Sequence, residues 1–228
     1  MLLLSLDTCG PSGTIALAHL NDGLKILAES SLPGKTYSAR LIPAISELLA
    51  AHNAVLPDLD AIVATSGPGS FTGIRIALST AKGLAEAHSI PVLAVSRLAV
   101  LAHKAQTPNH PIQAAALDAS RHEFYLGDYS SPNPRESLLT VTHFQQLSSA
   151  LGHHLAVCEE SLLTFASHAK LVPPPTAADA LHFALPRLRA RDFDNPVALD
   201  GNYLRRSDAE IFSPPQAVAV LPSDPVEP

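Results

Sequence analysis

Residues 65–87, TSGPGSFTGIRIALSTAKGLAEA, decide how we interpret this chain. An apolar run at 60–65, typical of a buried strand, leads into the glycine-rich segment 67–73, and a helical pattern then continues without a breaker until Pro91. A strand, a glycine-rich turn and a helix can aim backbone N–H groups at an anion. They can equally form a tight turn that serves packing alone, and the sequence leaves both interpretations open.

The glycine-rich segment is not a Walker A loop, whose pattern is G-x-x-x-x-G-K-[ST]. Counting from Gly67 or from Gly69 puts Gly73 or Arg75 at the lysine position. We therefore expect no cofactor. The candidates for an anion or nucleotide site, if the fold has one, are Asp7, Gly67, Gly69, Ser70 and Asp118.

The helical part of the stretch has small side chains on two faces. Residues four apart share a helix face, and small residues there let another backbone approach closely. Such a helix suits a position between its own sheet and a second neighbour, which is either another helix of this chain or a partner chain. The two stripes are Gly73, Ala77, Ala81 and Ala85, and Ile76, Thr80, Gly83 and Ala87.

Composition limits the class of protein. Of the 228 residues 46% are hydrophobic, and the formal net charge is -6 with no block of Lys and Arg. A protein that binds nucleic acid by itself usually has a basic patch, so we expect no strong tRNA binding by this chain alone. No signal peptide and no apolar run of about 18 to 20 residues is present, so we expect a cytoplasmic protein without membrane contact.

The sequence gives little support for a metal site or for a catalytic cysteine. None of the 11 histidines lies three or four residues from another, so the helical histidine pairs of zinc enzymes are missing and we expect no metal site. Cys9 and Cys158 suit a reducing compartment, and a disulfide between them stays open. No base can be named for Cys9, so we interpret it as structural.

The second half of the chain opens like the first. Residues 2–7 form an apolar run that ends in Asp7, and residues 114–118 form one that ends in Asp118; each is followed by a turn and a second strand pattern. The two carboxylates could orient magnesium beside a phosphate, or they could simply accept N–H groups of their turns. The repeat suggests an internal duplication.

A duplicated unit predicts an α/β fold of the actin, sugar-kinase and Hsp70 superfamily, with two subdomains that each have a mixed central sheet flanked by helices. By analogy, we divide the chain into subdomain 1–106, a degenerate subdomain 107–212 and a proline-rich, disordered tail 213–228. Further strands are expected at 24–30, 91–95 and 155–158, and helices at 38–52, 98–105, 142–151 and 176–191.

The expected helix 38–52 is apolar on two faces, which predicts burial on both sides, in its own domain or in a complex. Pro43 should kink this helix or mark a frayed first turn. The faces consist of Ile42, Ile45 and Leu49, and of Leu41, Ala44, Leu48 and Ala51.

Residues 67–78, GPGSFTGIRIAL, resemble the GPGSFTGLRIG-type signature of the TsaB (YeaZ) family, bacterial proteins of tRNA threonylcarbamoyladenosine synthesis. Further segments resemble the family at 4–8, 37–43, 90–96, 116–125 and 202–205. The chain departs from the family pattern at Tyr37 (usually His), at Ala77 (usually Gly) and at residues 65–66 (usually Gly-Arg).

The resemblance implies a non-catalytic scaffold that forms a heterodimer with TsaD, whose metal site transfers threonylcarbamoyl to the adenosine beside the anticodon. The ATPase TsaE joins the larger complex, which binds the tRNA, and the isolated chain could instead form a homodimer. Pairing uses the helices after the third strand and after the signature turn. From the two helices of this chain we expect an interface of Leu41, Ala44, Leu48, Arg75, Ile76, Thr80, Gly83 and Ala87.

Two rival functions share the fold. The first is an active ATPase or phosphotransferase that uses Asp7, Asp118 and the glycine-rich turn, although the residues after Asp118 are not glycine-rich. The second is a metallopeptidase, against which the absence of a histidine pair argues.

Overall fold

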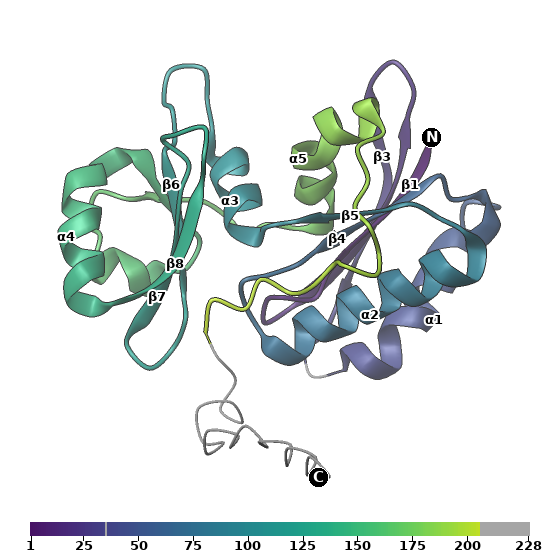
Figure 1. Ribbon diagram of the computed structural model, residues 1–228, viewed down its shortest axis with the longest axis horizontal. Helices are drawn as coiled ribbons and strands as arrows, with labels where there is room; N and C mark the ends of the chain where they lie inside the picture. The colour runs from purple at the N-terminus through teal and green to yellow at the C-terminus, as the bar shows by residue number, and fades with distance from the viewer. Residues whose placement is uncertain (35, 206–228) are drawn as a thin grey trace, which may run out of the picture.

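The computed structural model describes residues 1–34 and 36–205. The proline-rich tail that we expect at 213–228 lies outside the described residues. Two five-stranded mixed sheets organise the chain (Figure 1). The first has the order β3-β2-β1-β4-β5 and consists of β1 (Leu2–Asp7), β2 (Gly13–Leu20), β3 (Leu24–Leu32), β4 (Ala61–Thr65) and β5 (Val92–Val95).

The second sheet has the order β10-β9-β6-β7-β8. Its strands are β6 (Ala114–Asp118), β7 (Glu123–Asp128), β8 (Arg135–Thr140), β9 (Leu155–Val157) and β10 (Lys170–Leu171). In both sheets the first strand in sequence is antiparallel to the second and parallel to the fourth. The matching order and polarity confirm the duplicated α/β fold.

The helices separate and cover the two sheets. Figure 1 shows α1 and α2 on one face of the first sheet and α5 on the other, with α3 between α5 and the second sheet and α4 on the far side of that sheet. The α-helices are α1 (Tyr37–Ala50), α2 (Phe71–His88), α3 (Arg97–Ala105), α4 (Val141–Leu151) and α5 (Ala177–Ala190), and the 3₁₀-helices are Leu56–Asp58, Gly152–His154 and Glu160–Thr164.

Coverage on both faces explains why β1 is apolar throughout. Successive side chains of a strand point to opposite faces. Leu4 and Leu6 therefore pack with α1 and α2, and Leu3 packs with α5. All three are fully buried.

Helix α5 returns from the second half of the sequence to the first sheet. Its residues Ala180, Leu181 and Ala184 pack with Leu3 and Val63. Without α5 this face of the first sheet would be exposed to water. The first subdomain thus extends beyond the boundary that we expect at residue 106.

Helix α1 buries one broad face. Leu41, Ala44 and Leu48 lie in the core of the first subdomain, and Leu41 is only 1% exposed. Ile42 is 49% exposed, and the helix continues through Pro43. Ile45 and Leu49 on the other expected face are buried as well, so both apolar faces of α1 contribute to the core, and Ile42 is left exposed.

The sequence predicted the second sheet less completely than the first. No strand was expected at the positions of β8 and β10. β8 pairs antiparallel with β7 along its whole length, from Arg135 opposite Asp128 to Thr140 opposite Glu123. β8 alternates exposed and half-buried residues, so it lacks the continuous apolar run that identified the central strands.

Candidate functional site

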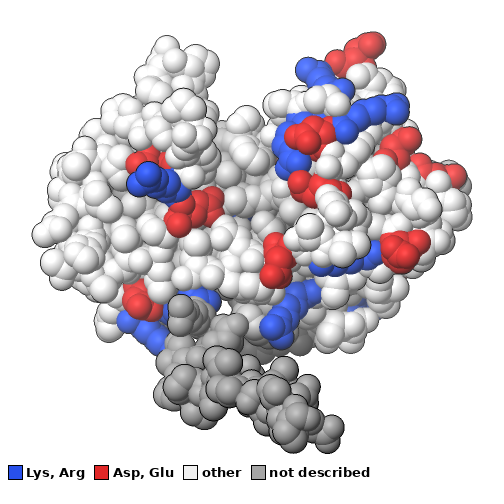
Figure 2. Space-filling model, in the orientation of Figure 1, with Lys and Arg blue, Asp and Glu red and all other residues white. Residues whose placement is uncertain are grey.

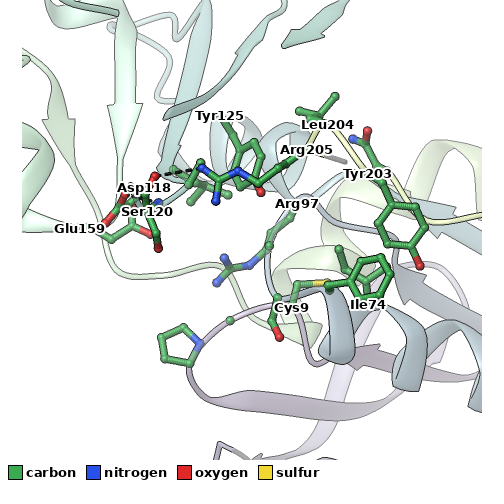
Figure 3. Close-up of a pocket in the computed structure, with 18 of the residues that line it drawn as sticks. Cys9, Ile74, Arg97, Asp118, Ser120, Tyr125, Glu159, Tyr203, Leu204 and Arg205 are labelled. Carbon is green, nitrogen blue, oxygen red and sulfur yellow. Dashed lines mark hydrogen bonds between the residues drawn. The ribbon is translucent and has the colours of Figure 1, made fainter. Parts of the chain in front are cut away.

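A cleft of about 840 Å³ lies between the two subdomains (Figure 3). It is bordered by the turn after β1, by the turn after β6 and by the last described segment of the chain. Of the five sequence candidates, Gly69, Ser70 and Asp118 line it directly. Its other lining residues are Cys9, Gly10, Pro11, Gly34, Tyr37, Phe71, Ile74, Arg97, Leu117, Ala119, Ser120, Arg121, Tyr125, Glu159, Asn202, Tyr203, Leu204 and Arg205.

The glycine-rich turn packs against the turn after β1. Gly69 has a φ of 155°, and a Cβ there would lie 2.4 Å from the carbonyl oxygen of Cys9. Ser70 donates its backbone N–H to that same oxygen over 2.8 Å, and its hydroxyl caps α2 by accepting the N–H of Gly73. Two N–H donors of this segment are therefore already used, which favours the packing interpretation of this turn.

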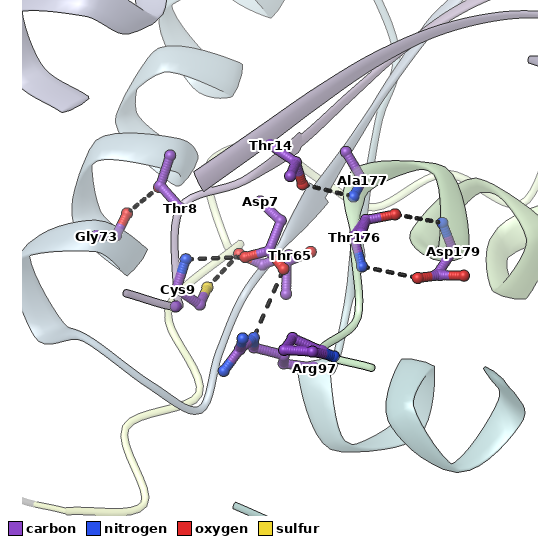
Figure 4. Close-up of polar contacts among 12 residues, drawn as sticks. Asp7, Thr8, Cys9, Thr14, Thr65, Gly73, Arg97, Thr176, Ala177 and Asp179 are labelled. Carbon is purple, nitrogen blue, oxygen red and sulfur yellow. Dashed lines mark hydrogen bonds and ion pairs between the residues drawn. The ribbon is translucent and has the colours of Figure 1, made fainter. Parts of the chain in front are cut away.

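Asp7 is buried and closes the turn that follows it. Its Oδ1 accepts the backbone N–H of Cys9 over 2.8 Å, and its Oδ2 lies 3.6 Å from Nε of Arg97 (Figure 4). Only 3% of Asp7 is exposed. The carboxylate thus has the role of a turn acceptor and an ion-pair partner.

Asp118 occupies the equivalent position after β6 and also closes its own turn. Its Oδ1 accepts the backbone N–H of Ser120 over 2.7 Å. Ser120, Arg121 and His122 all have positive φ values, between 56° and 61°. Side-chain-bearing residues hold this loop in the left-handed region that usually favours glycine, so it differs from a glycine-rich phosphate loop.

Arg97 is the residue of the cleft that sequence reasoning missed. It begins α3, and its side chain is only 6% exposed. The charge of Asp7 raises the pKa of Arg97 against the opposing effect of burial, so the guanidinium stays charged. Gly10 leaves room for it, because a Cβ there would lie 2.6 Å from Nη2 of Arg97. A charged residue at the start of a helix, two positions after a strand, was the available signal.

The thiols of the cleft are poor nucleophiles. Burial and the charge of Asp7 raise the pKa of Cys9 well above its ordinary value. Burial and the charge of Glu159 raise the pKa of Cys158 to about 12. Both cysteines are free. Because the thiolate is the reactive form, these shifts support a structural role for Cys9.

A segment after α5 joins the two subdomains. Asn202 donates its backbone N–H to Ser66 over 2.7 Å, and its side-chain amide contacts Glu136 of β8. Glu136 also accepts from Ser96 and, over 2.6 Å, from Tyr129. The carboxylate of Glu136 on the second sheet therefore accepts hydrogen bonds from Ser96 and Tyr129, which precede it in the chain, and from Asn202, which follows it.

The outer face of α2 carries the second stripe of small residues. Ile76 and Thr80 are half-buried, and Gly83 and Ala87 are exposed. Arg75 is exposed, with its guanidinium 4.0 Å above the ring centre of Phe71. Among the described residues, none lies within 4 Å of the Cβ position of Gly83 in the outward part of this stripe.

The expected interface is only partly exposed. Leu41, Ala44 and Leu48 of α1 are buried in the core, so the expectation that they face a partner is wrong. The large apolar residue that α1 exposes is Ile42. We use the name outer helical face for Ile42, Arg75, Ile76, Thr80, Gly83 and Ala87.

Charges on the surface are mixed. Figure 2 shows Lys and Arg interspersed with Asp and Glu on the face drawn, without a continuous basic field. Among the described residues, no group of three or more His, Cys, Asp or Glu side chains is arranged to hold a metal ion. None of the described helices has the length and apolar character needed to cross a membrane.

A family model described as TsaD, tRNA N6-adenosine threonylcarbamoyltransferase, matches residues 29–179. The chain is 34% identical over 130 residues to TsaB of Escherichia coli, a tRNA threonylcarbamoyladenosine biosynthesis protein. This alignment covers 57% of the present chain and 55% of the relative. To TsaB of Bacillus subtilis it is 35% identical over 133 residues, 58% of this chain and 57% of the relative. The match thus spans about half the length of these curated relatives.

Other matches extend over nearly the whole chain. An uncharacterized protein of Mycobacterium tuberculosis is 30% identical over 211 residues, 91% of this chain and 93% of the relative. The solved structure of YeaZ from Pseudomonas aeruginosa aligns with a TM-score of 0.69 and 26% identity, and covers 88% of this chain and 100% of that one. A second Pseudomonas aeruginosa structure, described as similar to peptidase YeaZ, gives a TM-score of 0.71 and 28% identity, with 90% and 99% covered.

Proposed function

This chain belongs to the TsaB (YeaZ) family, within the group that the threonylcarbamoyltransferase family model describes, and from that premise we propose that it is a non-catalytic subunit in tRNA threonylcarbamoyladenosine synthesis. In this role the chain supports the transfer of threonylcarbamoyl to the adenosine beside the anticodon, and the chemistry takes place in its partner TsaD. The ATPase TsaE and the tRNA join through the complex. Because tRNA is modified there, the proposal places the chain in the cytoplasm.

The outer helical face is the observation that carries this proposal. A glycine in the middle of an exposed helix costs stability relative to alanine, and Gly83 has no neighbour among residues 1–34 and 36–205 that requires it. A flat stripe of small residues lets a partner helix approach closely. Ile42 adds exposed apolar surface on the adjacent helix α1, and a partner that covered it would gain hydrophobic free energy.

Docking on α1 and α2 would leave the cleft and the second sheet outside the interface. The net charge of -6 and the mixed surface in Figure 2 favour tRNA contact through the complex rather than through this chain alone, because tRNA affinity rests largely on basic side chains. When TsaD is absent, the same face would favour a homodimer.

The test is co-purification of the full chain with TsaD from the same organism, followed by size determination. We expect a stable heterodimer that is lost in Gly83→Trp, because the indole would hold the two backbones apart. The matched control is Gly23→Trp, since Gly23 also has open space around its Cβ position but lies in the turn between β2 and β3. If both variants bind TsaD as the unmodified chain does, the interface is misplaced.

The rival function, an ATPase or phosphotransferase, has less support from the geometry. Asp7 and Asp118 both accept N–H groups of their own turns. Asp7 is in addition paired with Arg97. ATP hydrolysis by the purified chain that disappears in Asp118→Asn would establish the rival, and the absence of hydrolysis in both proteins would remove it.

A further inference from the structure

The guanidinium of Arg97, which lines the cleft, is a buried cation with one unused donor, Nε. Its Nε lies 3.6 Å from Oδ2 of Asp7, too far for a hydrogen bond. In the part of the chain that the structure describes, Nε is buried without a hydrogen-bond partner, and Asp7 is the ion-pair partner of Arg97. Figure 3 shows this guanidinium directed into the space between the turn of Cys9 and the loop of Asp118. A buried donor of this kind calls for an acceptor.

Glu159 supplies the complementary feature on the other wall. It follows β9 and lines the same cleft. Its Oε2 is buried and has no hydrogen-bond partner among the described residues. Burial raises the pKa of Glu159, although a hydrogen bond with Cys158 and the charge of Arg97 oppose this effect. Two residues that each carry a buried, unpartnered polar atom therefore line the same cavity.

Part of the remaining wall is apolar or aromatic. Ile74, Leu117, Tyr125 and Tyr203 line the cleft, and its volume of about 840 Å³ is within the range of small-molecule sites. Tyr203 is held in place by its contact with Phe71, at 5.0 Å between ring centres. The cleft thus combines apolar surface with polar groups, and among these Arg97 and Glu159 each carry a buried polar atom without a hydrogen-bond partner.

The polar groups around Arg97 favour a carboxylate over a phosphate as the anionic group of a ligand. Phosphate groups are usually held by backbone N–H groups of glycine-rich turns, and here the N–H groups of Cys9 and Ser120 are used by Asp7 and Asp118. The charge of Asp7 offsets the positive charge of Arg97, so this guanidinium by itself suits a monoanion better than a dianion. A planar carboxylate matches the fork of donors on a guanidinium.

We propose that the cleft binds a small carboxylic acid that also carries an amine or a hydroxyl group, with the carboxylate on the Arg97 guanidinium and the donor group on Oε2 of Glu159. The site is separate from the outer helical face and does not depend on the proposed function. Binding would engage residues of both subdomains.

Four probes of one carbon skeleton test the two contacts separately. They are L-valine, 2-hydroxyisovalerate, isovalerate, which lacks the donor, and isobutylamine, which lacks the carboxylate. Each is titrated into the full chain and followed by ligand-observed NMR. We expect saturable binding of the first two, and affinities at least about tenfold lower for the other two, as the loss of one hydrogen bond to a charged group would give. Equal affinity for all four, or no saturable binding of any, would overturn the proposal.

Two variants locate the site. Glu159→Met should weaken the binding of L-valine about tenfold and leave isovalerate unchanged, whereas Glu160→Met, at the exposed neighbour, should change neither. Arg97→Lys should weaken all three carboxylates, because ammonium lacks the planar fork. Circular dichroism confirms that each variant is folded. Unchanged L-valine affinity in folded Glu159→Met would contradict the site even if Arg97→Lys does not fold.

Discussion

The hydroxyl of Thr8 donates a hydrogen bond of 2.6 Å to the carbonyl oxygen of Gly73. This contact joins the turn after β1 to the first turn of α2, across 65 positions of sequence. The two backbones approach so closely that a Cβ on Gly73 would lie 1.9 Å from the carbonyl oxygen of Thr8. The glycine-rich signature is therefore explained by the contact between these two turns.

Gly73→Ala should destabilise the protein by about 2 kcal/mol or more, because the added methyl group meets backbone atoms that cannot move independently. Urea denaturation of the purified chain measures this change. Gly83→Ala is the matched control at an exposed position of the same helix. It should stabilise the chain by up to about 1 kcal/mol, since alanine is the better helix former and has open space there. Equal effects of the two substitutions would contradict the proposed packing.

The buried pair of Asp7 and Arg97 should be coupled. Removing one partner leaves the other charge buried, which typically costs about 3 kcal/mol. Asp7→Asn and Arg97→Gln should each destabilise the chain, and the double variant should be less destabilised than the sum of the two. A double-mutant cycle measured by chemical denaturation gives this coupling. Strictly additive effects would show that the 3.6 Å contact contributes nothing.

Thiol reactivity should follow the raised pKa values. A raised thiol pKa means less thiolate at a given pH, so alkylation of Cys158 by iodoacetamide should be slow at pH 8. It should rise about tenfold per pH unit while the pH stays below the pKa of about 12. Cys9, which is buried, should react more slowly still. Mass spectrometry of pulse-labelled protein measures both rates, and rapid labelling of either cysteine at pH 7 would contradict the structure.

The contact of Asn202 with Glu136 should hold the last described segment against the second sheet. Asn202→Ala should increase hydrogen exchange at the amides of residues 200–205, while exchange in β1 stays unchanged. The carboxylate of Glu136 would keep Ser96 and Tyr129 as partners, so we expect a local effect of about 1 kcal/mol. A loss of protection throughout the first sheet would assign this contact a wider role.

The sequence predicted the central strands and their helices because those elements carry strong periodic patterns. Asp7 and Asp118 marked the duplicated strand ends, and both of them line up with the observed first strands of the sheets. Their alternative role as turn acceptors agrees with the observed hydrogen bonds. Periodicity could not identify β8, whose side chains are half-exposed.

Sequence patterns could not predict contacts between residues that lie far apart in the chain. Arg97 and Glu159 line one cleft only because α3 packs against β9, although the two residues are 62 positions apart in the sequence. The sequence likewise did not show which apolar residues of α1 point toward the sheet. Leu41 and Ile42 are both apolar, and only the position of the sheet decides that the first is buried and the second exposed.

The central claim is tested most directly by reconstituting threonylcarbamoyladenosine formation on tRNA with purified partner proteins, with and without this chain. We predict that modification depends on the chain, that Gly23→Trp supports it fully, and that Gly83→Trp lowers it by at least about tenfold, in line with several kcal/mol lost at an overpacked interface. Modification at an equal rate without the chain, or with folded Gly83→Trp, would contradict the account.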